Sequence, residues 1–243
     1  MQKEIIILLT ATITPGEMPN TLLNNPKDRL KQYCSSLDYY LNKTKCKILF
    51  VENSGTDISS FYKEYIDLKR LEIITFKGNN FLKSLGKGYG ECLIIDHALN
   101  HSIFLKDNNT IVIKITGRLK VLNINYFLKQ CLIKDFDIAA ESLAHFKYTD
   151  SRFFIASIKF LKYFLNNKNQ ISDKVGENFE DILKKTILNS MNESMNMLFF
   201  KQIVRIQGIS GTNNTDYKSS YLSWFLRNLK RYIGLSLMNL KGL

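Results

Sequence analysis

Uninterrupted runs of β-branched and aliphatic residues recur through the first 143 residues, and segments with helical periodicity separate them. The first run, Glu4 to Ile13, reads EIIILLTATI and does not alternate polar with apolar positions. Such a run is typical of a strand buried on both faces of a parallel sheet. Further strands are predicted at residues 46–53, 71–77, 110–121 and 136–143, with a short one at 201–210. Because helices are predicted between the strands, the sequence indicates an α/β fold, a mostly parallel wound sheet with helices on both faces.

The pattern becomes helical after residue 150. One helix is predicted over residues 150–167, because Phe153, Phe154 and Ile158 fall on one helical face. A second helix is predicted over residues 177–195, which repeat apolar positions at the same spacing.

The end of the chain differs from the rest in charge. We predict one α/β domain over residues 1–215 and a basic amphipathic helix within residues 216–243. From Lys218 to Leu243 there are five basic residues and no acidic one. The apolar residues of this helix form one stripe, which consists of Leu222, Phe225, Leu226, Leu229 and Ile233. Two interpretations stay open: an interfacial helix on an anionic membrane surface, or a helix packed on the core with a solvated basic face.

The whole chain carries a formal charge of +12, from 34 Lys and Arg against 22 Asp and Glu. This excess favours a polyanionic partner, which could be nucleic acid, an anionic membrane or a phosphate-bearing small molecule. A nucleic-acid-binding or nucleic-acid-modifying α/β protein is therefore the alternative function. We expect no nucleic-acid partner, because the charge is densest in the C-terminal segment and no known nucleic-acid-binding module is present.

The sequence offers little to hold a structural metal or to cross a membrane. Its four cysteines are far apart, and His97 and His101 lack the glutamate that the H-E-x-x-H motif requires. The acidic pair Asp135 and Asp137 precedes a predicted strand instead of following one. No apolar run reaches the eighteen residues of a membrane span, and the N-terminal run is too short for a signal peptide. We therefore expect a cytoplasmic protein, either soluble or peripheral on a membrane.

Polar side chains follow the first four predicted strands, at the edge where wound parallel sheets bind ligands. They lie at Thr10 to Thr12, at Glu52 to Gly55, at Phe76 to Asn79 and at Lys114 to Arg118. A glycine-rich segment, GKGYGE at residues 86–91, opens a predicted helix. Backbone amides and a lysine at that point suit a phosphate group, although glycines that allow close packing in a tight turn are the simpler explanation of the segment taken alone.

These motifs together resemble bacterial surface-polysaccharide glycosyltransferases of the A-type fold, the enzymes of O-antigen and capsule synthesis. The resemblance rests on ENSG at residues 52–55, GKGYGE at 86–91 and KITGR at 114–118, and it extends over residues 4–215. It implies a nucleotide-sugar donor and a saccharide or lipid-linked acceptor. A lipid-linked acceptor would place the enzyme on the inner face of the plasma membrane.

The resemblance also implies roles for individual residues at the strand ends. The donor would be bound by Thr10, Thr12, Glu52, Asn53, Lys87, Gly88, Glu91, Lys114, Thr116, Gly117 and Arg118. Enzymes of this fold commonly hold a divalent metal through a D-x-D motif, but residues 114–118 contain no carboxylate. We hypothesise that the cations there neutralise the diphosphate leaving group directly, and we assign no metal ligand. A requirement for Mn²⁺ or Mg²⁺ stays open.

A transferase that inverts the sugar also needs a carboxylate to take the proton of the acceptor hydroxyl. The candidates are Glu177, Glu180, Asp181 and Asp150. Glu180 and Asp181 are neighbours on a predicted helix, so they cannot both point into one cleft. The sequence does not choose among the four, and for any single one a capping or solvated helix charge is the simpler explanation.

Overall fold

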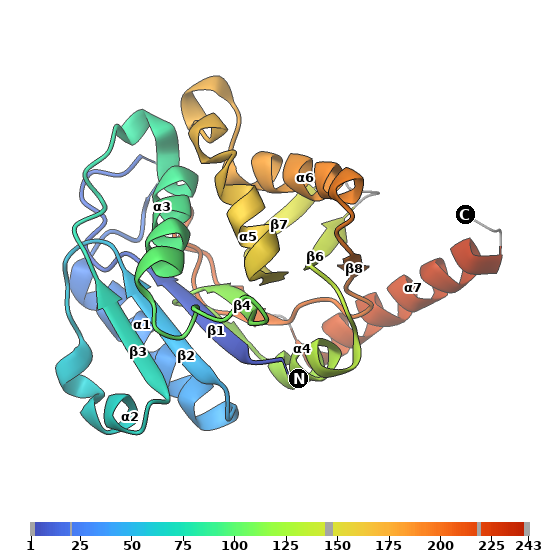
Figure 1. Ribbon diagram of the computed structural model, residues 1–243, viewed down its shortest axis with the longest axis horizontal. Coiled ribbons are helices and arrows are strands. Elements are labelled where there is room, and N and C mark those ends of the chain that lie inside the picture. Colours follow the sequence, from blue (N-terminus) through green and yellow to red (C-terminus); the bar gives the residue numbers. More distant parts are fainter. Residues whose placement is uncertain (1–2, 20, 144–147, 218–219, 241–243) are drawn as a thin grey trace.

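The computed structural model describes residues 3–19, 21–143, 148–217 and 220–240 of the 243-residue chain. In this part of the chain a seven-stranded sheet has the order β3-β2-β1-β4-β7-β6-β8 (Figure 1). Its strands are β1 (Ile5–Ala11), β2 (Lys47–Glu52), β3 (Leu71–Thr75), β4 (Ile111–Thr116), β6 (Ile138–Leu143), β7 (Tyr148–Ser157) and β8 (Met197–Phe199). All neighbouring pairs are parallel except those of β7, which is antiparallel to β4 and to β6. The mostly parallel wound sheet is therefore confirmed.

Helices cover both faces of the sheet, also as predicted (Figure 1). The helices are α1 (Pro26–Lys43), α2 (Lys63–Asp67), α3 (Gly86–His101), α4 (Ile124–Ile133), α5 (Ile158–Leu165), α6 (Phe179–Ser190) and α7 (Tyr221–Leu240). The apolar side chains of α3, α5 and α6 pack in one core layer, and those of α1 and α4 pack in the other.

The two core layers explain why the strands read as continuous apolar runs. In β1, Ile6 and Leu8 belong to the layer under α3, whereas Ile7 and Leu9 belong to the layer under α1. Successive side chains of a strand point to opposite faces, so a central strand covered on both sides must be apolar at every position. Burial of each such side chain is worth about 1.5–3 kcal/mol, so β1 contributes strongly to the stability of the sheet.

The helix predicted over residues 150–167 is wrong in its first half. Strand β7 occupies Tyr148–Ser157, and α5 begins only at Ile158, where the Ser157 hydroxyl accepts a hydrogen bond from the amide of Phe160 at 3.1 Å. Phe153 and Phe154 lie in opposite core layers, as strand neighbours do. Because both faces of β7 are buried, its apolar residues do not alternate with polar ones. The alternation that would distinguish a strand from a helix is therefore missing.

Two other predicted strands are shorter than expected. The strand predicted over residues 110–121 ends at Thr116, and after a turn the chain forms β5 (Lys120–Val121). The strand predicted over 201–210 is reduced to β9 (Ile206–Gln207), which pairs with β5 in a separate two-stranded sheet. Strand β8 was not predicted. The boundary between residues 215 and 216 stays a prediction.

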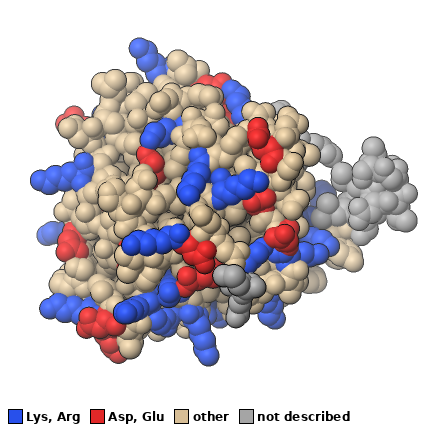
Figure 2. Space-filling view, viewed as in Figure 1, with Lys and Arg blue, Asp and Glu red and all other residues tan. Residues whose placement is uncertain are grey.

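Charged side chains are distributed over the surface without a single dominant patch on the face that Figure 2 shows, where acidic and basic groups are interspersed. No helix in the described ranges is both long enough and apolar enough to cross a membrane.

Candidate functional site

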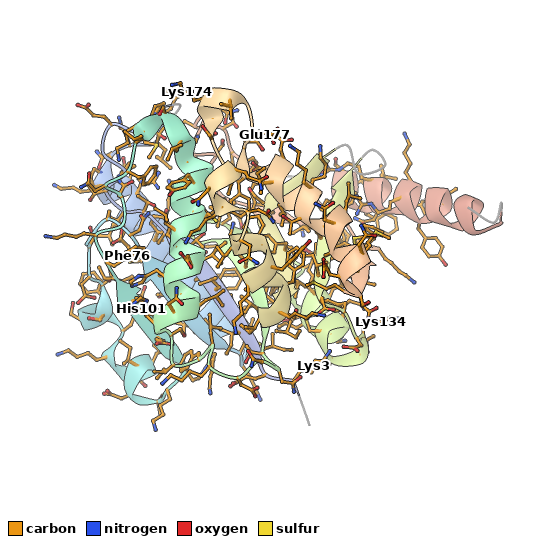
Figure 3. The ribbon with its side chains drawn as sticks, turned by 45° about the horizontal axis from the view of Figure 1, so that its top comes forward. Lys3, Phe76, His101, Lys134, Lys174 and Glu177 are labelled. Carbon is orange, nitrogen blue, oxygen red and sulfur yellow. The ribbon has the colours of Figure 1, made fainter. Side chains whose placement is uncertain are left out.

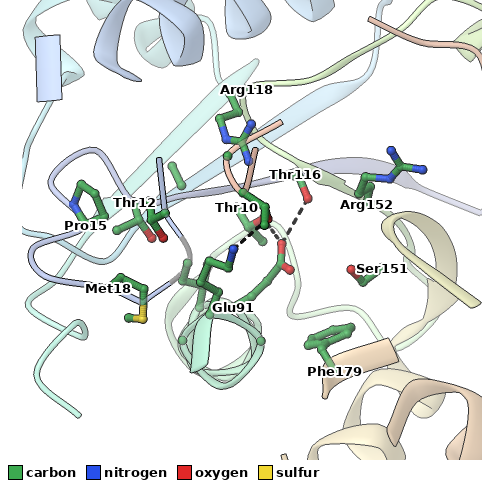
Figure 4. Close-up of a pocket in the computed structure, with 18 of the residues that line it drawn as sticks. Thr10, Thr12, Pro15, Met18, Glu91, Thr116, Arg118, Ser151, Arg152 and Phe179 are labelled. Atoms are coloured by element: carbon green, nitrogen blue, oxygen red, sulfur yellow. Dashed lines mark hydrogen bonds between the residues drawn. The ribbon is translucent and has the colours of Figure 1, made fainter. Parts of the chain in front are cut away.

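A cavity of about 640 Å³ opens at the carboxyl ends of β1, β2 and β4 (Figure 4). The register of the sheet creates it, because β1 pairs Thr10 with Thr116 of β4 and Ala11 with Glu52 of β2. Its other walls come from the first turn of α3, the first turn of α6, strand β7 and the loop that follows β9. This is the edge of the sheet where the sequence predicted a ligand.

The cavity brings together part of the predicted set. The predicted residues that line it are Thr10, Thr12, Asn53, Lys87, Gly88, Glu91, Thr116, Arg118 and Glu180. Six others are absent from its walls, and they are Glu52, Lys114, Gly117, Asp150, Glu177 and Asp181.

Glu91 is the carboxylate at the floor of the cavity, between β1 and β4 (Figure 4). Its Oε1 accepts a hydrogen bond from Thr10 Oγ1 at 2.8 Å and another from Thr116 Oγ1 at 3.4 Å. The two threonines are register partners, so the sheet itself fixes the position of this carboxylate. Glu91 was predicted to lie near the donor; the structure shows it in the cavity wall, held by hydrogen bonds to both threonines.

Lys114 lies behind this floor and not in the cavity. Its side chain has 0% exposure, and its Nζ lies 2.6 Å from Glu91 Oε1. The same Nζ donates to the Ser151 carbonyl at 2.5 Å and lies over the rings of Phe154 and Phe179. A lysine in this position cannot reach a ligand phosphate, so its predicted direct contact with the donor is not supported.

Glu52 and Gly117 shape the strand ends without reaching the cavity. The buried Glu52 carboxylate accepts hydrogen bonds from the backbone amides of Ile13 at 2.8 Å and Thr56 at 2.9 Å. It therefore orders the loops after β1 and β2. Gly117 is needed for a close approach, because a Cβ there would come within 2.7 Å of the Thr10 carbonyl oxygen. Beside them, Asn53 Oδ1 accepts from Thr12 Oγ1 at 2.7 Å.

Three cations gather on one side of the cavity: Arg29, Lys87 and Arg118. Arg118 donates a short hydrogen bond to the Ile209 carbonyl, and burial and the neighbouring Arg29 lower its pKa. Burial lowers the pKa of Lys87 as well, Arg118 lowers it further, and Asp173 acts in the opposite direction. These like charges are held close together in a partly buried place, where an anion between them would be strongly favoured.

Arg29 and Arg152 line the cavity but were not predicted. Arg29 is buried and donates to the carbonyls of Thr12 at 2.8 Å and Leu23 at 2.9 Å, so it also fixes the loop after β1. Its signal in the sequence was an arginine four residues before Tyr33, on the apolar face of α1. Arg152 lies over the Tyr217 ring and was hidden inside the segment assigned to a helix.

Of the four predicted base candidates, Glu180 alone lines the cavity. Its carboxylate accepts a short hydrogen bond from the Ser151 hydroxyl. Burial raises the pKa of Glu180, the Ser151 hydrogen bond opposes that shift, and the Glu91 charge adds to it. A carboxylate whose pKa is raised is a better proton acceptor when it is ionised.

The other three candidates are engaged in ion pairs. Asp150 pairs with Arg152, whose Nη2 lies 2.6 Å from Asp150 Oδ2. Glu177 pairs with Lys185 at 2.6 Å and lies at the outer edge of the molecule in Figure 3. Asp181 lies 3.7 Å from the Lys184 ammonium, and its backbone amide donates to the helix cap at Asn178. The packing of α6 therefore places Glu180 in the cavity wall and leaves Asp181 outside it.

No group of three His, Cys, Asp or Glu side chains within the described ranges could hold a metal ion. His97 and His101 form an aromatic stack instead. The centroid of the His97 ring lies 3.8 Å from that of Phe76 and 3.8 Å from that of His101. The residues at the end of β4 do not fit the D-x-D arrangement, and we derive no catalytic step through a metal.

Comparison with known proteins gave structural likeness only. No family model matches the chain, and no curated protein matches it. Among solved structures, the glycosyltransferase GlyE of Streptococcus pneumoniae TIGR4 is 13% identical with a TM-score of 0.46, over 82% of this chain and 45% of that one. A structure described as a nucleotide-diphospho-sugar transferase, from Desulfovibrio desulfuricans G20, is 11% identical with a TM-score of 0.45, over 82% and 80%. TarS 1–349 of S. aureus, solved with UDP, is 13% identical with a TM-score of 0.42, over 96% and 65%.

The chain thus spans less than half of the GlyE chain that it matches. At these identities and TM-scores the matches assign no activity to it. The α/β class rests on its own sheet order and on the helices that cover both faces.

Proposed function

We propose that the protein transfers a sugar from a nucleotide-sugar donor to a saccharide acceptor, with the donor bound in the cavity at the ends of β1, β2 and β4. The observation that carries this proposal is the arrangement of charge. Lys87, Arg118 and Arg29 repel one another on one side of the cavity, and the half-buried carboxylate of Glu180 lines the same cavity. A diphosphate relieves the repulsion, and a sugar attached to it would lie near a base.

The first turn of α3 supports a phosphate at the same place. Gly88 and Gly90 line the cavity, and the residue before the helix, Leu85, provides no side-chain cap. The amide of Gly86 donates to the Lys83 carbonyl of the preceding turn, and the helix dipole favours an anion beside the following residues of the N-terminus. Together with Lys87 in the same turn, these groups suit the diphosphate of a nucleotide sugar.

The nucleoside would lie against the ends of β1 and β2. Thr12 and Asn53 provide hydrogen-bonding groups there, and the Phe81 ring provides an aromatic face. Glu52, which the resemblance placed in this contact, is instead engaged by backbone amides.

The proposed chemistry is a direct displacement. The acceptor hydroxyl oxygen forms a bond with the anomeric carbon of the sugar while the bond from that carbon to the diphosphate oxygen breaks. The proton of the hydroxyl passes to the carboxylate of Glu180, and the electron pair of the broken bond stays on the diphosphate. Lys87 and Arg118 would stabilise the charge that develops on this leaving group.

We place the reaction in the synthesis of bacterial surface polysaccharide, an O-antigen or a capsule. This finer assignment rests on the sequence motifs that resemble such enzymes. An acceptor carried on a lipid would require the enzyme to work at the inner face of the plasma membrane. The exposed helix α7 supports that location.

Thermal unfolding with UDP-, GDP-, CDP- and TDP-sugars, and with DNA and RNA as controls, tests the binding part. We expect one nucleotide class to raise the melting temperature, and we expect the effect to vanish in the Lys87→Ala/Arg118→Ala variant. Lys31→Ala, which removes an exposed lysine of α1 outside the cavity, is the matched control and should keep the effect. Stabilisation by nucleic acid alone, or an equal shift in the double variant, would overturn the proposal.

A further inference from the structure

Helix α7 is attached to the rest of the protein by polar contacts. Trp224 Nε1 donates to the Ile203 carbonyl at 2.9 Å, and the Ile203 amide donates to Asn228 Oδ1 at 2.8 Å. One turn further along, Arg231 makes a bidentate ion pair with Glu141 at 2.6 and 3.0 Å. Beyond these contacts the helix extends away from the body of the molecule (Figure 1).

Most of the apolar stripe of α7 faces away from this attachment, and Tyr221 at its start contacts the body of the described protein, where its ring lies under the Arg205 guanidinium. Seven apolar side chains between residues 221 and 233 are each at least 47% exposed: Tyr221, Leu222, Phe225, Leu226, Leu229, Tyr232 and Ile233. A surface helix of a globular protein normally buries its apolar stripe and exposes its polar side. Here the apolar stripe is exposed, so the interpretation in which the stripe packs on the core is wrong. This set of seven residues is called the outer stripe below.

The charges around the outer stripe indicate what covers it. Arg227 and Lys230 are exposed, whereas the charge of Arg231 is neutralised by the buried Glu141. The sequence from residue 218 to 243 contains no acidic residue. A second copy of the helix would bring like charges together with no acid to pair them. An anionic lipid surface offers apolar chains to the stripe and phosphates to the two cations.

We propose that α7 is an interfacial helix that lies on an anionic bilayer, with the outer stripe in the acyl region and with Arg227 and Lys230 at the lipid phosphates. The Arg231–Glu141 pair holds the helix so that the stripe stays turned outward before any membrane is present. This inference specifies how the protein would reach the membrane location given in the proposed function. Only the biological role of membrane binding rests on that proposed function. The test of membrane binding uses neither donor nor acceptor. Failure of the membrane proposal can therefore be distinguished from failure of the sugar-transfer proposal.

The experiment measures binding of the full chain to vesicles by sedimentation. Vesicles of phosphatidylcholine with one quarter phosphatidylglycerol are compared with phosphatidylcholine alone, at low and high salt. We expect binding to the anionic vesicles that weakens as salt increases. The Phe225→Glu/Leu229→Glu variant should lose at least about tenfold in affinity, because each side chain contributes its burial energy to insertion. The Arg227→Gln/Lys230→Gln variant should lose about tenfold and most of its salt dependence.

An apolar surface elsewhere provides the matched control. Leu132→Glu/Ile133→Glu changes two exposed apolar residues at the end of α4 and should leave vesicle binding unchanged. Because all of these side chains are exposed, the variants should fold normally, which circular dichroism verifies. No binding of the full chain to anionic vesicles would overturn the inference, as would equal binding by the stripe variant. A stripe-dependent dimer in solution that does not bind vesicles would assign the outer stripe to a second copy instead.

Discussion

Lys114 Nζ lies 2.6 Å from Glu91 Oε1, and the lysine side chain is completely shielded from solvent. The same ammonium bonds the backbone of Ser151, whose hydroxyl in turn bonds Glu180. A single buried cation therefore connects the two carboxylates that line the cavity. We regard Lys114 as a positioning residue that acts through Glu91 and Ser151, and not as a ligand of the donor.

The first prediction concerns removal of that cation. Lys114→Met should destabilise the fold by about 3 kcal/mol, because it leaves the carboxylate of Glu91 without its partner. Urea unfolding measures this loss. The double variant Lys114→Met/Glu91→Gln should recover part of it, since neither charge then remains. Equal stability of the wild type and Lys114→Met would contradict the claim that Lys114 stabilises the carboxylate of Glu91.

The same substitution should change the pH dependence of turnover. Burial raises the pKa of Glu180, and the Lys114 charge opposes that shift. A base acts only when it is ionised, so the rate should fall as the pH drops below the pKa of Glu180. In Lys114→Met this decline should begin at a higher pH. A pH–rate profile with an unchanged acid limb would show that Lys114 has no influence on the base.

The third prediction separates the base from its neighbours. Glu180→Gln should lower kcat by about 10²- to 10⁴-fold while the donor still binds. Its stability should also change with pH. A carboxyl whose pKa is raised on folding contributes stability below its unfolded pKa, and that contribution is lost as the pH rises through the folded pKa. Glu180→Gln should therefore be more stable, relative to the wild type, at pH 8 than at pH 4.

Glu177→Gln is the control for that variant, because Glu177 pairs with Lys185 and does not line the cavity. It should retain turnover. If Glu177→Gln were as inactive as Glu180→Gln, the assignment of the base would be wrong.

The attachment of α7 makes a fourth prediction. Burial raises the pKa of Glu141 and Arg231 lowers it, so loss of the arginine leaves a buried carboxylate that is costly when ionised. Arg231→Met should destabilise the protein by about 3 kcal/mol at pH 8 and by less at pH 4, where the carboxyl is protonated. Urea unfolding at both pH values measures the difference. Arg227→Met, which removes an exposed cation of the same helix, should have little effect at either pH.

The sheet was largely predictable because its first four strands are apolar at consecutive positions and are separated by amphipathic helices. Strand β7 was not, since Phe153 and Phe154 are buried on opposite faces and the same residues also fit a helical stripe. The parallel topology predicts which edge of the sheet carries the cavity. It does not predict which individual side chains line that cavity.

Whether a polar residue at a strand end reaches a cavity depends on side-chain direction and on partners distant in sequence. Lys114 and Thr116 are two residues apart in one strand. Lys114 forms an ion pair with Glu91 of α3 and does not line the cavity, whereas Thr116 does. The sequence around Glu180 does not distinguish it from Glu177 and Asp181. The distinction comes from the packing of α6, which brings Glu180 alone of the three to the cavity. Arg29 was not predicted as a site residue because it lies on the buried face of α1, where an apolar residue is the rule.

The most direct test of the central claim follows release of nucleoside diphosphate from a panel of nucleotide sugars, with and without saccharide acceptors. Wild-type protein and Glu180→Gln are compared, and donor binding is measured in parallel by calorimetry. We predict that the wild type consumes one donor and that Glu180→Gln binds this donor without turning it over. Binding of no nucleotide sugar by the wild type, or equal turnover by both proteins, would contradict a sugar transferase that uses Glu180 as its base.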